Sequence, residues 1–129
     1  MMILKDIMPV LALVAGLQAK HFVCDGPLQT KAMVDAKSHY GAWLGIVHSG
    51  VHAIGTAVVF LIAGYSVALF LGLGALDFVL HYHVDYTKEN IVKHFKWGFA
   101  DAKFWWALTA DQCLHHFTYL ILAALALTI

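Results

Sequence analysis

The chain has 129 residues, of which 61% are hydrophobic and only 12% are charged. Soluble domains are about one-quarter charged and about half apolar, so this composition indicates an integral membrane protein. Eight basic residues, all of them lysine, balance eight acidic residues, which excludes the basic footprint of a nucleic-acid-binding protein and an acidic tail. The length allows one domain, and we expect residues 1–129 to form a single transmembrane helical domain.

Four apolar stretches qualify, in whole or in part, as membrane-spanning helices of about 20 residues. They cover approximately residues 7–24, which end before Gly26-Pro27, and residues 40–63, 66–84 and 104–129, the third with an extension toward residue 95. Between them, residues 28–39 and 87–103 carry lysines at helical spacing, as amphipathic interface segments do. The sequence therefore predicts an all-α, integral-membrane four-helix bundle with short amphipathic interface segments.

The lysines predict how the spans are oriented. With four spans, seven of the eight lysines fall on the side of the first and third loops, and only Lys5 falls with the termini. The positive-inside rule then places both long loops in the cytoplasm of a bacterial inner-membrane protein. Gln18, Lys20 and His21 interrupt the first stretch, which argues against a cleaved signal peptide.

Each predicted span carries two metal-competent side chains four residues apart. Residues at this spacing lie on the same face of a helix. Along an up-down-up-down path, the pairs also come to the same depth, in the half of the bundle next to the long loops. We therefore expect one site on the cytoplasmic side, formed by His21, Asp25, His48, His52, His81, Asp85, Asp111 and His115.

Aspartates at membrane depth need a compensating charge, because each costs about 2.5–3.5 kcal/mol on insertion scales. The chain has no arginine, and most lysines fall in predicted loops. Five imidazoles and three carboxylates suit two divalent ions of zinc, iron or manganese, as in the carboxylate–histidine sites of helical bundles. Around these ligands we expect four residues to orient a ligand, a bound water or a substrate: Gln29, Asp77, Lys88 and Gln112.

Three other interpretations fit part of this pattern. Polar pairs can join membrane helices by hydrogen bonds without any metal. Histidines on neighbouring helices can hold a haem, although the three aspartates disfavour the apolar pocket that haem needs. Ion transport would require a polar path through the other half of the bundle, which holds only Gln18 and Asp77.

The polar motifs also match the pattern of a family. The chain reads His21-x-x-x-Asp25-x-x-Leu28-Gln29-Thr30-x-x-Met33-x-x-x-Lys37, then His48-x-x-x-His52, His81-x-x-x-Asp85-x-x-Lys88 and Asp111-Gln112-x-x-His115. From about residue 10 to 120 it resembles an uncharacterised family of small bacterial and phage membrane proteins, domain of unknown function thirty-three-oh-seven. Gly26 departs from the aromatic residue expected there. The resemblance implies a multi-span helical membrane protein and no particular reaction.

The function that we expect first is metal-dependent hydrolysis of a lipid or a lipid-linked phosphate, since a metal pair activates a bound water. This expectation also follows a looser similarity to membrane-bound metal-dependent hydrolases, which rests on analogy. The alternative is a structural or regulatory membrane protein, such as a phage-encoded factor, whose metal or polar network holds the bundle together. The sequence leaves the choice open. We expect membrane lipid as a partner and no nucleic acid. The sequence does not decide whether the protein forms a homo-oligomer.

Overall fold

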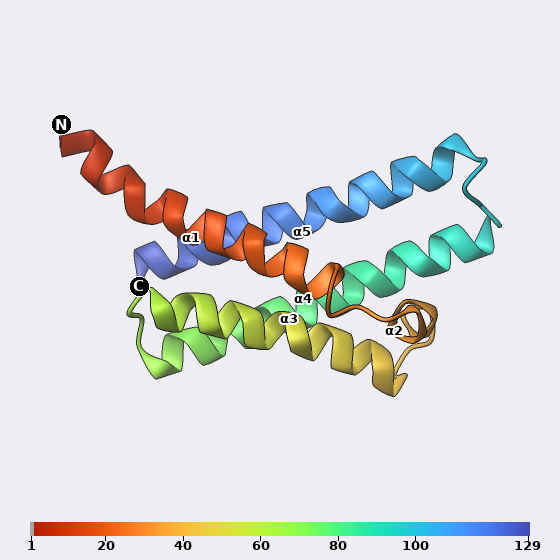
Figure 1. The fold of residues 1–129 in the computed structure, drawn as a ribbon, viewed down its shortest axis with the longest axis horizontal. Helices are drawn as coiled ribbons and strands as arrows, with labels where there is room; N and C mark the ends of the chain where they lie inside the picture. Colours follow the sequence, from red (N-terminus) through yellow and green to blue (C-terminus); the bar gives the residue numbers. More distant parts are fainter. Residues whose placement is uncertain (1) are drawn as a thin grey trace.

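The computed structural model describes the backbone of residues 2–129 and the side chains of residues 7–129. This part of the chain is all helical and contains no strand. The helices, drawn in Figure 1, are α1 (Met2–Asp25), α2 (Lys31–Ala36), α3 (Trp43–Ile62), α4 (Val67–His94) and α5 (Ala102–Thr128). The predicted all-α class is confirmed, but the described chain has five helices instead of four.

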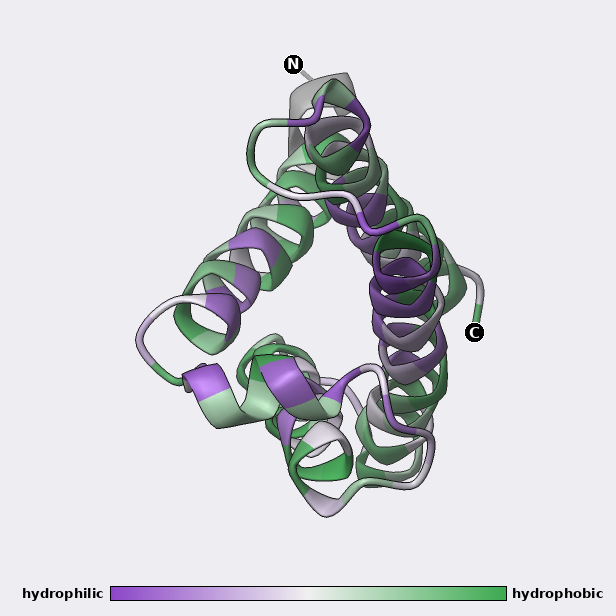
Figure 2. Cartoon of the chain, turned by 90° about the vertical axis from the view of Figure 1, so that its right-hand side faces the viewer, coloured by the Kyte–Doolittle hydropathy of each residue, from purple (hydrophilic) through white to green (hydrophobic). Residues whose placement is uncertain are grey.

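The four long helices run up and down in chain order and close into a ring. Helix α1 packs on α3 and α5, and α4 packs on the same two helices from the other side. Residues 26–42, which include α2, and residues 95–101 lie at one end of the bundle, here called the loop end. Both termini and the short α3–α4 connection lie at the other, terminal end (Figure 1). Viewed from the loop end, hydrophobic residues alternate with hydrophilic ones along the helices (Figure 2).

The two predicted interface segments take different forms. Residues 28–39 contain α2, a six-residue helix that begins after Thr30, whose side chain accepts a hydrogen bond from the backbone N–H of Met33. Residues 87–103 are not a separate element, because α4 continues to His94 and α5 begins at Ala102. The row of buried residues on α4 extends to Asp85, beyond the predicted end of the span at residue 84. The helix therefore continues into the segment that was expected to be separate.

Three helices are long and apolar enough to cross a membrane, over Ile7–Asp25, Trp43–Ile62 and Val67–His94. This finding supports membrane association, whereas the inner membrane and the cytoplasmic orientation stay predictions. The fourth predicted span, in α5, does not reach the same threshold. Its middle carries Asp111, Gln112, His115 and His116, which lower the hydropathy of the helix.

The interior changes from polar to apolar along the bundle. At the terminal end the helices enclose a hydrophobic cluster, and toward the loop end the same helix faces bury histidine, aspartate and lysine side chains. The cluster consists of Leu13, Leu17, Phe60, Leu73, Tyr119, Leu122, Ala123 and Ala126. The apolar end therefore closes the bundle next to a buried polar layer.

Helices α3 and α4 approach each other closely at Gly74. A Cβ atom at this position would lie 2.9 Å from the backbone oxygen of Ala53, which cannot move aside as a side chain can. We expect Gly74→Ala to lower the free energy of unfolding by about 1–3 kcal/mol, as overpacking does. Gly72→Ala, where a Cβ would meet nothing within 4 Å, is the control and should leave stability unchanged or slightly raised. Thermal unfolding in detergent measures both, and equal behaviour of the two variants would contradict the prediction.

Candidate metal centre

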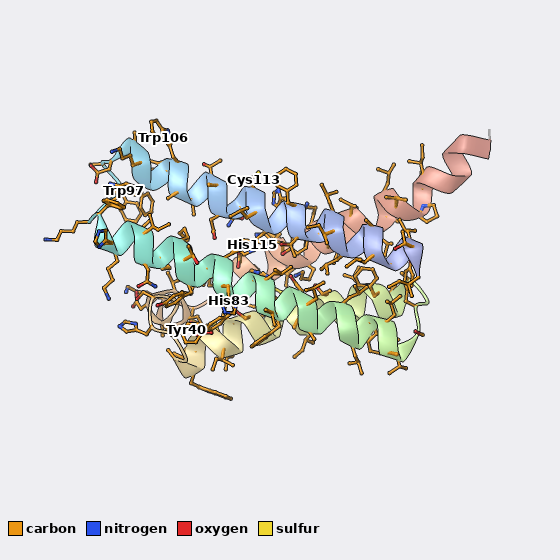
Figure 3. All side chains as sticks on the ribbon, turned by 180° about the vertical axis from the view of Figure 1, so that it is seen from behind. Tyr40, His83, Trp97, Trp106, Cys113 and His115 are labelled. Atoms are coloured by element: carbon orange, nitrogen blue, oxygen red, sulfur yellow. The ribbon has the colours of Figure 1, made fainter. Side chains whose placement is uncertain are left out.

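The eight residues expected at the site do come together, two from each long helix. Four histidines are at most 1% exposed: His48, His52, His81 and His115. Asp85 and Asp111 are buried as well, and Asp25 is the most accessible, with 20% of its side chain exposed. The i and i+4 spacing places each pair on the inner face of its helix, and Figure 3 shows His115 between the helices midway along the bundle.

A first grouping joins α1, α3 and α4. It consists of Asp25, His48, His52 and His81, whose potential ligand atoms all lie within 4.8 Å of one another. Asp25 Oδ1 is 2.9 Å from His52 Nε2 and 3.3 Å from His48 Nε2. His48 Nε2 and His81 Nε2 face each other at 3.2 Å. Three imidazole nitrogens and one carboxylate oxygen thus converge, which is a donor set suited to a transition metal.

A second grouping joins α4 and α5 and shares one residue with the first. It consists of His81, Asp85 and His115, again with ligand atoms within 4.8 Å. Asp85 Oδ1 is 3.2 Å from His115 Nε2, and Asp85 Oδ2 is 3.3 Å from His81 Nε2. Asp111 Oδ1 lies 3.4 Å from His115 Nε2 and accepts no hydrogen bond in this structure. Asp111 therefore borders this grouping from α5.

His21 lies at the edge of the centre and belongs to neither grouping. Its Nδ1 is 2.6 Å from the hydroxyl of Tyr119, and its Nε2 donates to Gln112 Oε1 at 2.8 Å. The same Nε2 is 3.1 Å from Asp25 Oδ2. Both ring nitrogens of His21 thus have protein partners, and the ring holds Asp25 and Gln112 in place.

Two lysines, one from the first predicted span and one from the predicted interface segment 28–39, lie inside the protein next to the site, where the sequence analysis expected no compensating cation. Lys20 Nζ is 2.8 Å from Asp77 Oδ2, and Lys37 Nζ is 2.8 Å from Asp85 Oδ2, with all four side chains at most 7% exposed. Lys20 lies within α1, three residues after the buried Leu17, so helical spacing alone could have indicated its burial.

Asp77 forms a separate layer toward the terminal end. Its Oδ2 accepts hydrogen bonds from Lys20 Nζ at 2.8 Å and from Thr56 Oγ1 at 2.6 Å. Lys20 also donates to His52 Nδ1 and to the Tyr119 hydroxyl, at 3.3 Å each. The structure gives Asp77 no contact with an imidazole, and Lys20 links it to the histidines.

The other three neighbours expected at the site line a polar cavity. This cavity, here called the polar chamber, has a volume of about 330 Å³ and extends from the loop end to Asp25 and Asp111. Gln29 accepts from Lys37 at 2.7 Å, and Gln112 donates to Asp111 at 3.2 Å. The charged residues in its wall are Asp25, Lys37, Lys88, Glu89 and Asp111. The polar chamber thus reaches the carboxylates of the His/Asp core from the loop end, and a separate cavity of about 370 Å³ reaches His21 and Asp25 beside Gln18 and His116.

Fold and site together define an all-helical protein with three helices long and apolar enough to cross a membrane and a buried His/Asp core that could hold a metal ion. The chain belongs to the DUF3307 family, described as "Protein of unknown function", which matches residues 13–129. This family is the one that the polar motifs resembled, and the matched range includes all eight predicted ligands. No curated protein and no solved structure matches the chain. A bacterial or phage origin and a similarity to hydrolases stay predictions.

Proposed function

We propose that the protein is a membrane metalloprotein that binds divalent transition metal between α1, α3, α4 and α5. The observation that carries this proposal is the 3.2 Å separation of His48 Nε2 and His81 Nε2. Two imidazoles on one tetrahedral zinc ion, with bonds of about 2.0–2.1 Å, have their nitrogens about 3.4 Å apart. The two rings therefore already have nearly the spacing of ligands on one ion.

The balance of buried charge supports the same proposal. Four aspartates lie in or beside the core: Asp25, Asp77, Asp85 and Asp111. Lys20 and Lys37 compensate two of these charges, and Lys88 is paired with Glu89. Two negative charges remain, and a divalent cation compensates them without protonating any imidazole. Uncompensated charges at this depth cost several kcal/mol each, so a compensating cation stabilises the fold.

Two ions fit the donor set better than one. A neutral imidazole uses one nitrogen for one metal, so His81 cannot serve both groupings at once. Asp25, His48, His52 and His81 then hold one ion, and Asp85, Asp111 and His115 hold the other. If His52 binds through Nε2, its proton moves to Nδ1, and Lys20 keeps Asp77 and Tyr119 as partners. Zinc, iron and manganese all suit such mixed sites.

The reaction that we propose is hydrolysis of a lipid or lipid-linked phosphate. The polar chamber supports it, because it leads to Asp25 and Asp111 and gives water and a phosphate group a route to the metal. In this reaction the oxygen of a metal-activated water bonds to phosphorus while the bond from phosphorus to the alcohol oxygen breaks. A carboxylate accepts the proton of the water, and the leaving alcohol takes up a proton.

The test combines elemental analysis with an assay of phosphate release from a lipid phosphate. We expect about two equivalents of zinc, iron or manganese in protein purified in detergent without chelator. We also expect phosphate release that stops on chelation and returns when metal is added back. Protein without bound metal, in a sample that is folded by circular dichroism, would contradict the proposal. Bound metal without phosphate release would overturn the hydrolase alone.

A structural polar network is the second candidate, and the buried pairs Lys20–Asp77 and Lys37–Asp85 favour it. In this case two protonated imidazoles balance the remaining charge, and the network fixes how the helices pack. Haem fits less well, because the rings of His52 and His81 stack at 3.6 Å and leave no room for a porphyrin. Ion transport is disfavoured by the apolar cluster at the terminal end, which contains Leu17, Phe60 and Leu122.

A further inference from the structure

A second cavity lies on the outer side of the bundle, between α4 and α5. This α4–α5 groove has a volume of about 700 Å³, within the range of about 300–1,000 Å³ that is usual for small-molecule sites. Its wall is mainly apolar, with Leu80, Val84 and Ile91 from α4 and Ala107, Ala110 and Leu114 from α5. A groove of this kind fits a hydrocarbon chain.

The groove and the polar chamber meet at two residues. Lys88 of α4 and Asp111 of α5 line both cavities, and Lys88 Nζ is 4.0 Å from Asp111 Oδ2, so this ion pair stands between the apolar outer surface and the polar interior. Asp111 also lies 3.4 Å from His115 of the second grouping. A molecule that is polar at one end and apolar at the other could therefore reach the His/Asp core from the side of the bundle.

We propose that the α4–α5 groove holds the hydrocarbon chain of a lipid whose phosphate head group replaces Asp111 as a partner of Lys88 and so enters the polar chamber. This inference rests on the proposed function, because it assigns a substrate class to the proposed metal site. It adds the route of entry, the residues that hold the chain and the lysine that faces the head group.

The charge of the chamber selects the head group. Lys37 and Lys88 lie in the wall of the chamber with Asp25, Glu89 and Asp111, and Lys37 also pairs with Asp85, so these six side chains carry two net negative charges without metal. One divalent ion makes the net charge zero, and a second ion makes it +2. The chamber with two ions therefore attracts an anionic phosphate, whereas the metal-free chamber repels it. Binding of an anionic lipid should consequently depend on the metal.

The loop-end mouth of the groove has the residues of a membrane interface. Trp97 and Trp106 line it, and Figure 3 shows both at the end of the α4–α5 pair where the connecting loop lies. Lys103 also lines the groove, with its Nζ 5.8 Å from the centre of the Trp97 ring. Tryptophan is enriched at the level of the lipid head groups. The mouth of the groove therefore lies at a level where a lipid can enter it directly from the membrane leaflet.

Native mass spectrometry of detergent-purified, metal-loaded protein tests the proposal, with phosphatidic acid and phosphatidylcholine of identical chains as probes. Ala110→Trp fills the groove and should weaken phosphatidic acid binding about tenfold or more, because several methylene groups lose their contacts. Ala124→Trp, on the exposed surface of α5 outside the groove, is the matched control and should bind like the wild type. Equal binding by these two variants would overturn the proposal.

The head group is tested on the same samples. We expect Lys88→Gln to weaken phosphatidic acid binding about tenfold while phosphatidylcholine is unaffected, and Lys93→Gln, at an exposed position of α4, to change neither. Chelation should remove the preference for phosphatidic acid. Elemental analysis separates the two proposals. Metal-loaded protein that binds both lipids equally overturns the groove proposal alone, whereas protein without metal overturns the proposed function.

Discussion

Lys20→Met is expected to lower the free energy of unfolding by about 3–5 kcal/mol, as breaking a buried ion pair by removing one partner does. Lys20 Nζ lies 2.8 Å from Asp77 Oδ2, and the two side chains are only 4% and 1% exposed. Methionine keeps the length and apolar volume of the lysine stem, so the variant removes charge and little packing. It leaves Asp77 as an uncompensated carboxylate beside an apolar cluster that contains Leu17 and Phe60.

A double-mutant cycle in detergent, read by thermal unfolding, measures this interaction. Lys20→Met/Asp77→Leu removes both charges and should recover most of the lost stability, since an apolar pair of similar volume replaces a buried ion pair at little cost. Lys31→Met is the matched control, because Lys31 forms an ion pair with Asp35 at 2.6 Å but is 87% exposed. This control should change stability little. A Lys20→Met variant as stable as Lys31→Met would show that the buried pair does not hold α1 against α4.

The site could be predicted from the sequence because two simple periodicities agree. The spacing of His48 and His52, for example, places both on one face of α3, whatever that helix contacts. Antiparallel helices joined by short connections then bring such faces to the same depth, as His81 and His115 show on α4 and α5. Neither step requires knowledge of the side-chain contacts, so the convergence of these side chains followed from local rules, whereas their role as metal ligands stays a prediction.

The partners of the buried charges could not be predicted in the same way. Lys20 and Asp77 are 57 residues apart, and no local pattern links one lysine to one of several aspartates. Lys37 follows the short helix α2, and only the fold of residues 26–42 brings it to Asp85. The sequence, with no arginine and most lysines in predicted loops, indicates a core without cations. The structure supplies two lysines and still leaves two negative charges, so the case for a metal now rests on geometry and on this balance.

His81→Gln is expected to remove one of the two proposed ions, because His81 is one of the four residues that hold the ion between α1, α3 and α4, whereas Asp85, Asp111 and His115 hold the other. Structural zinc sites of four ligands contribute about 10–16 kcal/mol, so the loss of one ligand should weaken binding about a hundredfold or more. Elemental analysis should show fewer than the two equivalents expected for the wild type. Chelation should lower the unfolding temperature of the wild type, since metal at 1,000 times its Kd contributes about 4 kcal/mol, and should lower that of the variant less, because only the second ion remains to be removed.

The control for this variant is His83→Gln, two residues away on the same helix. His83 is exposed and lies 3.1 Å from the hydroxyl of Tyr40, and it belongs to neither grouping. The His83→Gln variant should keep the metal content and the response to chelation of the wild type. Side chains two residues apart on an α-helix lie on different faces, so the side chain at position 83 points away from the core. If both variants kept wild-type metal content, the groupings around His81 would not be the binding site. If both lost it, the metal would depend on the packing of α4 rather than on the His81 imidazole.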